Sequence, residues 1–132
     1  ADTEALEKEI AQAKRIFVGG AGRSLLSMKG FAMRLMQTGH ETYLVGEVCT
    51  PSVQPGDLLI VGSGSGETKV TLDVVNKAKG HGARVAVLTM HGNSPIAQAG
   101  DCAVVLDGII GSLMVQKGQT GEIIRYNHAN LE

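Results

Sequence analysis

Aromatic residues, proline and cysteine are all scarce in this chain of 132 residues. It has two phenylalanines, two tyrosines, no tryptophan, three prolines and two cysteines. Cys49 and Cys102 lack the spacing of a metal site, and each stands beside an expected strand, so we predict two reduced thiols rather than a disulfide. Few aromatics combined with 18 glycines are more typical of an α/β protein with aliphatic strands than of a β-sandwich.

Charge of one sign and long apolar runs are lacking as well. Twelve basic and 13 acidic residues give a net charge of -1, and no Lys/Arg cluster supplies the electrostatic footprint of a nucleic-acid partner. No apolar run approaches the ~20 residues that span a bilayer, and the charged N-terminus does not resemble a signal peptide. We therefore expect a cytoplasmic protein with no nucleic-acid or membrane partner. A chain of this length predicts one domain, 1–132, with a single core.

What the chain does have is an alternation of short apolar runs and amphipathic segments. The helical spacing of Leu6, Ile10 and Ala13 predicts a first helix. Apolar runs predict strands at 15–18, 42–45, 57–61, 83–89 and 102–106, and helical segments fall at 23–38, 67–79 and 94–99. Strands that alternate with helices imply right-handed parallel crossovers, and therefore a doubly wound α/β sheet.

The carboxyl ends of those strands carry most of the glycines and hydroxyl groups. Ligands of open parallel sheets bind at this edge, which here collects the segments GGAGRS, GEVCTP, GSGSGET and TMHGNSP. The richest of them lies within LLIVGSGSGETKV, from Leu58 to Val70. A helix that begins after this loop directs its first N–H groups and its positive dipole end at the loop. The segment therefore predicts a phosphate site, and a plain glycine turn with an N-capping serine is the alternative.

Two common phosphate-binding motifs fail at named positions. A P-loop that starts at Gly62 requires glycine where Glu67 stands, and the lysine that would follow it is also absent. A dinucleotide-binding turn that uses Gly20 and Gly22 requires a third glycine where Leu25 stands. Nucleotide hydrolysis and NAD binding are therefore disfavoured, and the hydroxyls of the second loop suit a phosphate monoester.

Five segments together resemble one known family. GAGRS, FAMRLM, VGE, GDLLIVGSGSGET and the terminal HANLE are similar to the sugar isomerase (SIS) family, and within it to the 6-phospho-3-hexuloisomerases. The resemblance implies a three-layer α/β/α sandwich around a five-stranded parallel sheet. It also implies interconversion of 3-hexulose 6-phosphate and fructose 6-phosphate in the ribulose monophosphate pathway of formaldehyde assimilation. It implies no metal and no organic cofactor, and a homo-oligomer, dimer or tetramer, whose subunits complete one another's sites.

The binding residues follow from the two loops. The expected sugar-phosphate site consists of Gly22, Arg23, Ser24, Ser63, Gly64, Ser65 and Thr68. The chain also departs from the family. Relatives carry, between the fifth strand and the final helix, a connection and a helix whose glutamate is usually assigned as the catalytic base, whereas here CAVVL runs directly into DGIIGSLMVQKG. We therefore expect about one and a half elements to be missing, and a sugar-phosphate-binding domain without turnover is the alternative function.

Isomerisation through an enediolate requires a base that moves a proton between two carbons. Glu67 stands near the expected phosphate, although a carboxylate at a helix N-terminus also fits a purely electrostatic role. Glu47 follows the second strand at the ligand edge, where it is equally suited to be a solvated charge. His91 follows the fourth strand as an acid or base, or as a solvated loop residue. His128 matches the histidine of the family's C-terminal tail and ranks first.

Overall fold

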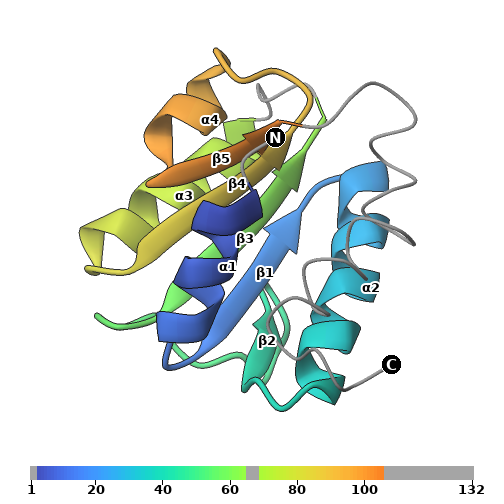
Figure 1. The fold of residues 1–132 in the computed structure, drawn as a ribbon, viewed down its shortest axis with the longest axis vertical. Coiled ribbons are helices and arrows are strands. Elements are labelled where there is room, and N and C mark those ends of the chain that lie inside the picture. The colour runs from blue at the N-terminus through green and yellow to red at the C-terminus, as the bar shows by residue number, and fades with distance from the viewer. Residues whose placement is uncertain (1–2, 65–68, 106–132) are drawn as a thin grey trace.

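The computed structural model describes residues 3–64 and 69–105, and within them an α/β fold (Figure 1). Four helices and five strands alternate in these residues. In chain order they are α1 (Thr3–Gln12), β1 (Ile16–Gly20), α2 (Arg23–Gln37), β2 (Thr42–Leu44), β3 (Leu58–Ser63), α3 (Lys69–Gly80), β4 (Arg84–Thr89), α4 (Pro95–Ala99) and β5 (Cys102–Val105). No helix within 3–64 or 69–105 is long and apolar enough to cross a membrane.

All five strands lie parallel in one sheet, in the order β2-β1-β3-β4-β5. The chain moves outward from β1 to β2 and then returns to place β3 on the other side of β1. The order of the strands therefore reverses between β1 and β3, which is where open parallel sheets bind ligands. This arrangement confirms the predicted three-layer fold with a five-stranded parallel sheet.

Alternate residues of each strand supply two apolar clusters, one on each face of the sheet, instead of the single core that the chain length predicts. On one face, α1 and α2 cover Ile16, Val18 and Ile60, and on the other face α3 and α4 cover Phe17 and Leu59. These strand residues are at most 1% exposed. Because both faces are covered, β3 is apolar at each position from Leu58 to Val61, and β4 from Val85 to Leu88, rather than at every second position.

Several helix boundaries have local causes that the sequence indicates. Thr38 is the last-turn cap of α2, and Gly39 follows with a φ of +99°, a left-handed conformation that glycine adopts at little cost. At α4 the Ser94 hydroxyl accepts a hydrogen bond from Ala97 N–H at 3.3 Å, and Pro95 begins the helix. Both helix ends lie within two residues of their predicted positions.

Two expectations about apolar segments are wrong. The third strand continues to Ser63 instead of ending at Val61, because Gly62 and Ser63 remain paired with Leu88 and Thr89 of β4. The helical setting of Met28, Met33 and Met36 predicts that all three fill the core, but Met33 is 52% and Met36 is 55% exposed, while Met28 is buried. All three lie in α2, but only Met28 is on the face that packs against the sheet.

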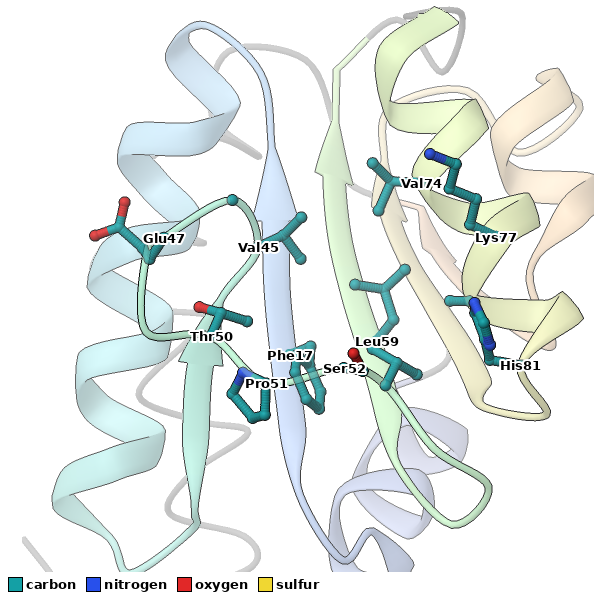
Figure 2. A pocket seen from close by; sticks show the side chains of 13 residues that line it. Phe17, Val45, Glu47, Thr50, Pro51, Ser52, Leu59, Val74, Lys77 and His81 are labelled. Carbon is teal, nitrogen blue, oxygen red and sulfur yellow. The ribbon is translucent and has the colours of Figure 1, made fainter.

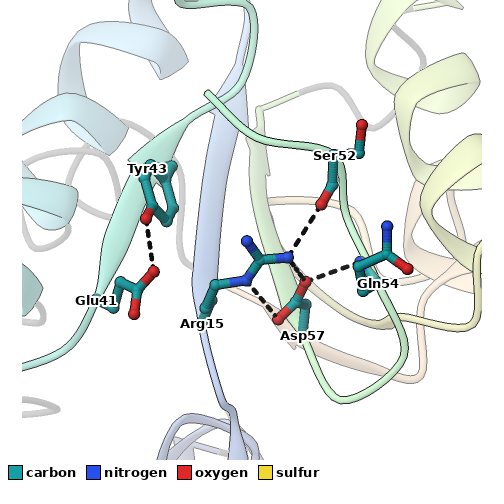
Figure 3. A network of polar contacts seen from close by, with 6 residues as sticks. All are labelled: Arg15, Glu41, Tyr43, Ser52, Gln54 and Asp57. Atoms are coloured by element: carbon teal, nitrogen blue, oxygen red, sulfur yellow. Dashed lines mark hydrogen bonds and ion pairs between the residues drawn. The ribbon is translucent and has the colours of Figure 1, made fainter. Parts of the chain in front are cut away.

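An ion pair between half-buried Arg15 and buried Asp57 joins the amino ends of β1 and β3 (Figure 3). The Arg15 guanidinium donates from Nε and Nη2 to the two oxygens of Asp57, at 3.1 and 2.6 Å, and also from Nη2 to the Ser52 carbonyl. Asp57 is 2% exposed and accepts a third hydrogen bond from Gln54 N–H. Burial raises the pKa of Asp57, but Arg15 and the Gln54 N–H lower it by more, so the pKa lies below its usual value. These bonds attach the segment between β2 and β3 to the edge of the sheet opposite the predicted site.

Cys49 is exposed and Cys102 is half-buried. Neither forms a disulfide, as the sequence predicts.

Candidate functional site

Glycines bring the loops after β1 and β3 into direct contact. Gly20 pairs with Gly62 across the two strands, and a Cβ on Gly20 would lie 3.1 Å from the Gly62 carbonyl oxygen. A Cβ on Gly62 would lie 2.7 Å from both Cγ and Sδ of Met28, which comes from α2. The loops and α2 approach this closely because side chains are absent here.

Two of the predicted binding segments are joined by a hydrogen bond. Gly64 N–H donates to the Ser24 hydroxyl oxygen at 3.3 Å, across 40 residues of sequence. Ser24 lies in the first turn of α2, and Ser63, 4% exposed, precedes Gly64 at the end of β3. The structure therefore brings Ser24, Ser63 and Gly64 together, while Arg23 is exposed at the start of the same helix.

The N-terminus of α2 adds a feature that the sequence analysis did not single out. Gly22 is the N-cap residue, with φ +59° and ψ -133°, and no side chain caps the helix. The first-turn N–H groups and the positive end of the dipole of this 15-residue helix therefore lie beside the Ser24–Gly64 contact. This arrangement suits an anion. Gly22 is the sequence signal for this uncapped helix end, because an N-cap glycine has no side-chain hydroxyl with which to cap the helix.

The end of β4 borders the same loops. The Gly64 carbonyl accepts hydrogen bonds from Met90 N–H at 3.3 Å and from the Thr89 hydroxyl at 3.5 Å. The Thr89 oxygen in turn accepts from His91 N–H at 3.2 Å, and the His91 residue is exposed. Three of the four loops predicted at this edge are thus linked through Gly64 and Thr89.

Glu47 lies apart from these contacts. It lies at the rim of a pocket of about 450 Å³ between α3 and the segment that follows β2, with an apolar floor that includes Phe17 and Leu59. Figure 2 shows its carboxylate pointing away from that floor, while Lys77 of α3 and His81, which follows the end of that helix, lie on the opposite side of the pocket. Glu47 is exposed. The described contacts therefore do not bring Glu47 together with Ser24, Ser63 or Gly64.

The other predicted site residues lie outside the described residues. They are Ser65, Glu67, Thr68 and His128. Within 3–64 and 69–105, no three His, Cys, Asp or Glu side chains are grouped closely enough to hold a metal ion. The described site residues, Gly22, Arg23, Ser24, Ser63 and Gly64, present backbone N–H groups, hydroxyls and one guanidinium, which are groups that suit an anion.

The sequence profile of the SIS domain family matches residues 9–108, a stretch that includes all of these contacts. The chain belongs to the SIS domain family. A 3-hexulose-6-phosphate isomerase from Methylomonas aminofaciens is 42% identical to this SIS chain, over 91% of this chain and 82% of the relative. One from Mycobacterium gastri is 43% identical, over 76% of this chain and 51% of the relative.

A solved structure agrees with the fold of this SIS domain. A hypothetical protein from Methanococcus jannaschii superposes with a TM-score of 0.83 and 32% identity, over 98% of this chain and 78% of that one. Its structure was described as inferring a molecular function of 3-hexulose-6-phosphate isomerase.

The alignments also reveal a difference in length. The alignment to the Methylomonas protein runs over 148 residues and takes in 91% of 132 residues here, about 120, so about 28 residues of that relative have no counterpart. The alignment to the Mycobacterium protein runs over 101 residues and takes in 76% of this chain, about 100 residues, so it has almost no such gap. A continuous stretch of about 100 residues therefore retains the spacing of the family.

Proposed function

We propose that this SIS domain is a 6-phospho-3-hexuloisomerase, which interconverts 3-hexulose 6-phosphate and fructose 6-phosphate. The reaction is supported by the relatives that carry the name 3-hexulose-6-phosphate isomerase, at 42% and 43% identity. The observation that carries the proposal is the meeting of two glycine- and serine-containing loops at the strand-order reversal, joined by the Ser24–Gly64 hydrogen bond. Those loops present hydroxyls and N–H groups at the edge where the fold binds ligands.

The phosphate of the sugar is bound by the hydroxyls of Ser24, Ser63, Ser65 and Thr68, and Gly64 contributes by donating its N–H to the Ser24 oxygen, which leaves the Ser24 O–H free to donate to the phosphate. Gly22 leaves the N-terminus of α2 uncapped, so this helix dipole also favours the phosphate dianion. Arg23 approaches from the first turn of the helix as a charged donor. This assignment is supported by the chemistry of the residues and by the contacts among the described ones.

The proton transfer requires one base near C2 and C3 of the sugar. We assign His128 as the first candidate and keep Glu67 and Glu47 as the other two. An imidazole exchanges protons near neutral pH without a large shift of its pKa. The exposed carboxylate of Glu47, which points away from its pocket floor, makes it the weakest of the three.

A second function, sugar-phosphate binding without turnover, is favoured by one observation. About 28 residues of the Methylomonas relative have no counterpart here, which is the size of the one and a half elements that the sequence predicts to be missing after the fifth strand. If the missing residues held the catalytic base, the chain would bind its sugar phosphate and not convert it.

We also propose that the chain forms a homo-oligomer, a dimer or a tetramer, through the outer face of α2. Leu26, Met33 and Met36 are 67%, 52% and 55% exposed. Their spacing of seven and three residues places them on one side of the helix. A second copy of the chain that packs on this face would remove these apolar side chains from water. Sedimentation equilibrium tests this, and Met33→Lys is expected to shift the mass towards one chain.

Calorimetry with fructose 6-phosphate, inorganic phosphate and fructose tests the binding site. The first two ligands are expected to bind, and unphosphorylated fructose is not. A hydrogen bond to a charged group contributes about 1.5–3 kcal/mol, so Ser63→Ala should weaken binding by about ten-fold or more. Equal binding of fructose and fructose 6-phosphate would remove the phosphate as the anchor. An unchanged affinity in Ser63→Ala would move the site elsewhere.

A further inference from the structure

Gly64 is held on both sides by side chains and backbone from other loops. Its N–H donates to the Ser24 hydroxyl of α2, and its carbonyl accepts from Met90 N–H and the Thr89 hydroxyl at the end of β4. The residue follows directly after β3, and its neighbour Ser63 pairs in register with Thr89. The orientation of this peptide therefore depends on groups that lie 25 to 40 residues away in sequence.

Thr89 connects two of the loops through one oxygen. Its hydroxyl donates to the Gly64 carbonyl at 3.5 Å and accepts from His91 N–H at 3.2 Å. The residue is 1% exposed. A buried hydroxyl must have partners, because an unsatisfied one costs about 1–3 kcal/mol. Here both partners are backbone groups of loops at the proposed site.

We propose that Thr89 is a positioning residue for sugar-phosphate binding, which acts by fixing the peptide of Gly64 and through it the hydroxyl of Ser63. The inference rests on the proposed function, and it needs no contact between Thr89 and the ligand. Hydrogen bonds weaken steeply as their angles open, so a small rotation of the Gly64 peptide reduces phosphate affinity. The same hydroxyl orients the backbone at His91, so the loops after β3 and β4 keep one relative arrangement.

Two substitutions separate positioning from stability. Thr89→Val keeps the shape and the methyl group but loses both hydrogen bonds of the hydroxyl. Thr89→Ser keeps the hydroxyl and loses the buried methyl group. A purely structural role predicts that affinity follows stability in both variants, whereas positioning predicts that affinity follows the hydroxyl.

A matched control lies at the opposite edge of the sheet. The Thr42 hydroxyl, at the amino end of β2, donates to the His40 carbonyl at 3.0 Å. Thr42→Val therefore removes one hydroxyl-to-carbonyl hydrogen bond from the same type of residue, far from the three linked loops. We expect it to leave fructose 6-phosphate affinity unchanged.

The experiment measures the dissociation constant for fructose 6-phosphate by calorimetry, and stability by urea unfolding, for the full chain and the three variants. Thr89→Val should weaken binding about ten-fold and shift the backbone amide resonances of Gly64 and His91. Thr89→Ser should lose stability while it binds within two-fold of the parent, and kcat/KM should follow the same order.

The outcomes distinguish this inference from the proposed function. If the parent chain binds fructose 6-phosphate and Thr89→Val binds it equally well, the positioning role is wrong and the proposed function stands. If Thr89→Ser weakens binding as much as Thr89→Val, the methyl packing decides and the inference also fails. If the parent chain binds no fructose 6-phosphate, both fail. Should Thr89→Val not fold, Thr89→Ser still decides between the roles, because affinity within two-fold of the parent despite lost stability supports positioning, whereas affinity that falls with stability contradicts it.

Discussion

Substitution of Gly62 by alanine tests how closely α2 must approach β3 for the two loops to meet. The added Cβ would lie 2.7 Å from Cγ and Sδ of Met28, a distance that real Cβ contacts essentially never reach. Met28 is 1% exposed and packs in the core between α2 and the sheet, so it has little room to move. Overpacking of this kind costs about 1–3 kcal/mol. We therefore expect Gly62→Ala to lower the free energy of unfolding by that amount.

The cause is isolated by a double-mutant cycle with Met28→Ala. That substitution alone opens a cavity and should cost about 2–5 kcal/mol. In the double variant the new Cβ of residue 62 occupies part of the vacated space, so the combined loss should fall short of the sum by about 1 kcal/mol or more. Urea unfolding of the four proteins measures all terms, with each kcal/mol moving the midpoint by roughly 0.3–1 M.

Gly30→Ala is the matched control. Gly30 lies inside α2, and a Cβ there would meet nothing within 4 Å. Alanine is the better helix former by about 1 kcal/mol, so this variant should be more stable than the parent. If Gly62→Ala were as stable as the parent, or if its effect simply added to that of Met28→Ala, the close approach of α2 to β3 would be refuted.

Three further predictions concern stability. Burial raises the pKa of Asp57, but Arg15 and the Gln54 N–H lower it by more, so the pKa in the folded protein lies below its usual value. Ionisation of Asp57 therefore stabilises the fold above pH ~4, and this stabilisation is lost as the pH falls through the folded pKa. Because the remaining partner Arg15 is partly exposed, Asp57→Asn should cost about 1.5–3 kcal/mol at pH 7 and progressively less in acid unfolding below pH ~4. A pH-independent difference would contradict the ion pair. Burial, and then the charge of Glu4, raise the pKa of Glu7, so ionisation of Glu7 opposes folding above its usual pKa. Glu7→Gln should therefore melt at a higher temperature than the parent at pH 7 and at the same temperature at pH 3. An equal melting temperature at pH 7 would argue against the raised pKa. Ser94→Ala removes the cap of α4 and should cost about 1 kcal/mol in urea unfolding, whereas Ser94→Asp should retain most of that stability.

The order and type of the elements follow from the sequence because apolar runs and helical spacing are local signals. Strand β3 is longer than predicted because Gly62 and Ser63 read as a turn, while their pairing with β4 is a property of the sheet. Helical periodicity identifies α2, but it does not reveal which of its methionines meets the sheet, and Met33 lies outside the core. Burial of a side chain depends on the elements that pack against it in the fold, and local sequence does not identify those elements.

The candidate site also combines features that local sequence predicts with features that depend on distant residues. Residue types at the strand ends predict an anion site at the carboxyl edge of the sheet, because that edge follows from the topology. The Ser24–Gly64 bond spans 40 residues and the Arg15–Asp57 pair spans 42, so neither has a local signal. The position of Glu47 after β2 agrees with the sequence prediction, but the sequence gives no signal for its carboxylate pointing away from the pocket floor. Sequence position places a residue near an edge, and tertiary packing decides where its side chain points.

Turnover is the most direct test of the proposed isomerase. The full chain of 132 residues, with 3-hexulose 6-phosphate as substrate and a coupled assay for fructose 6-phosphate, should form product with no added metal or nucleotide. Ser63→Ala should lower kcat/KM by about ten-fold or more. A chain that binds fructose 6-phosphate and forms no product would contradict the isomerase and leave the sugar-phosphate-binding domain as the function.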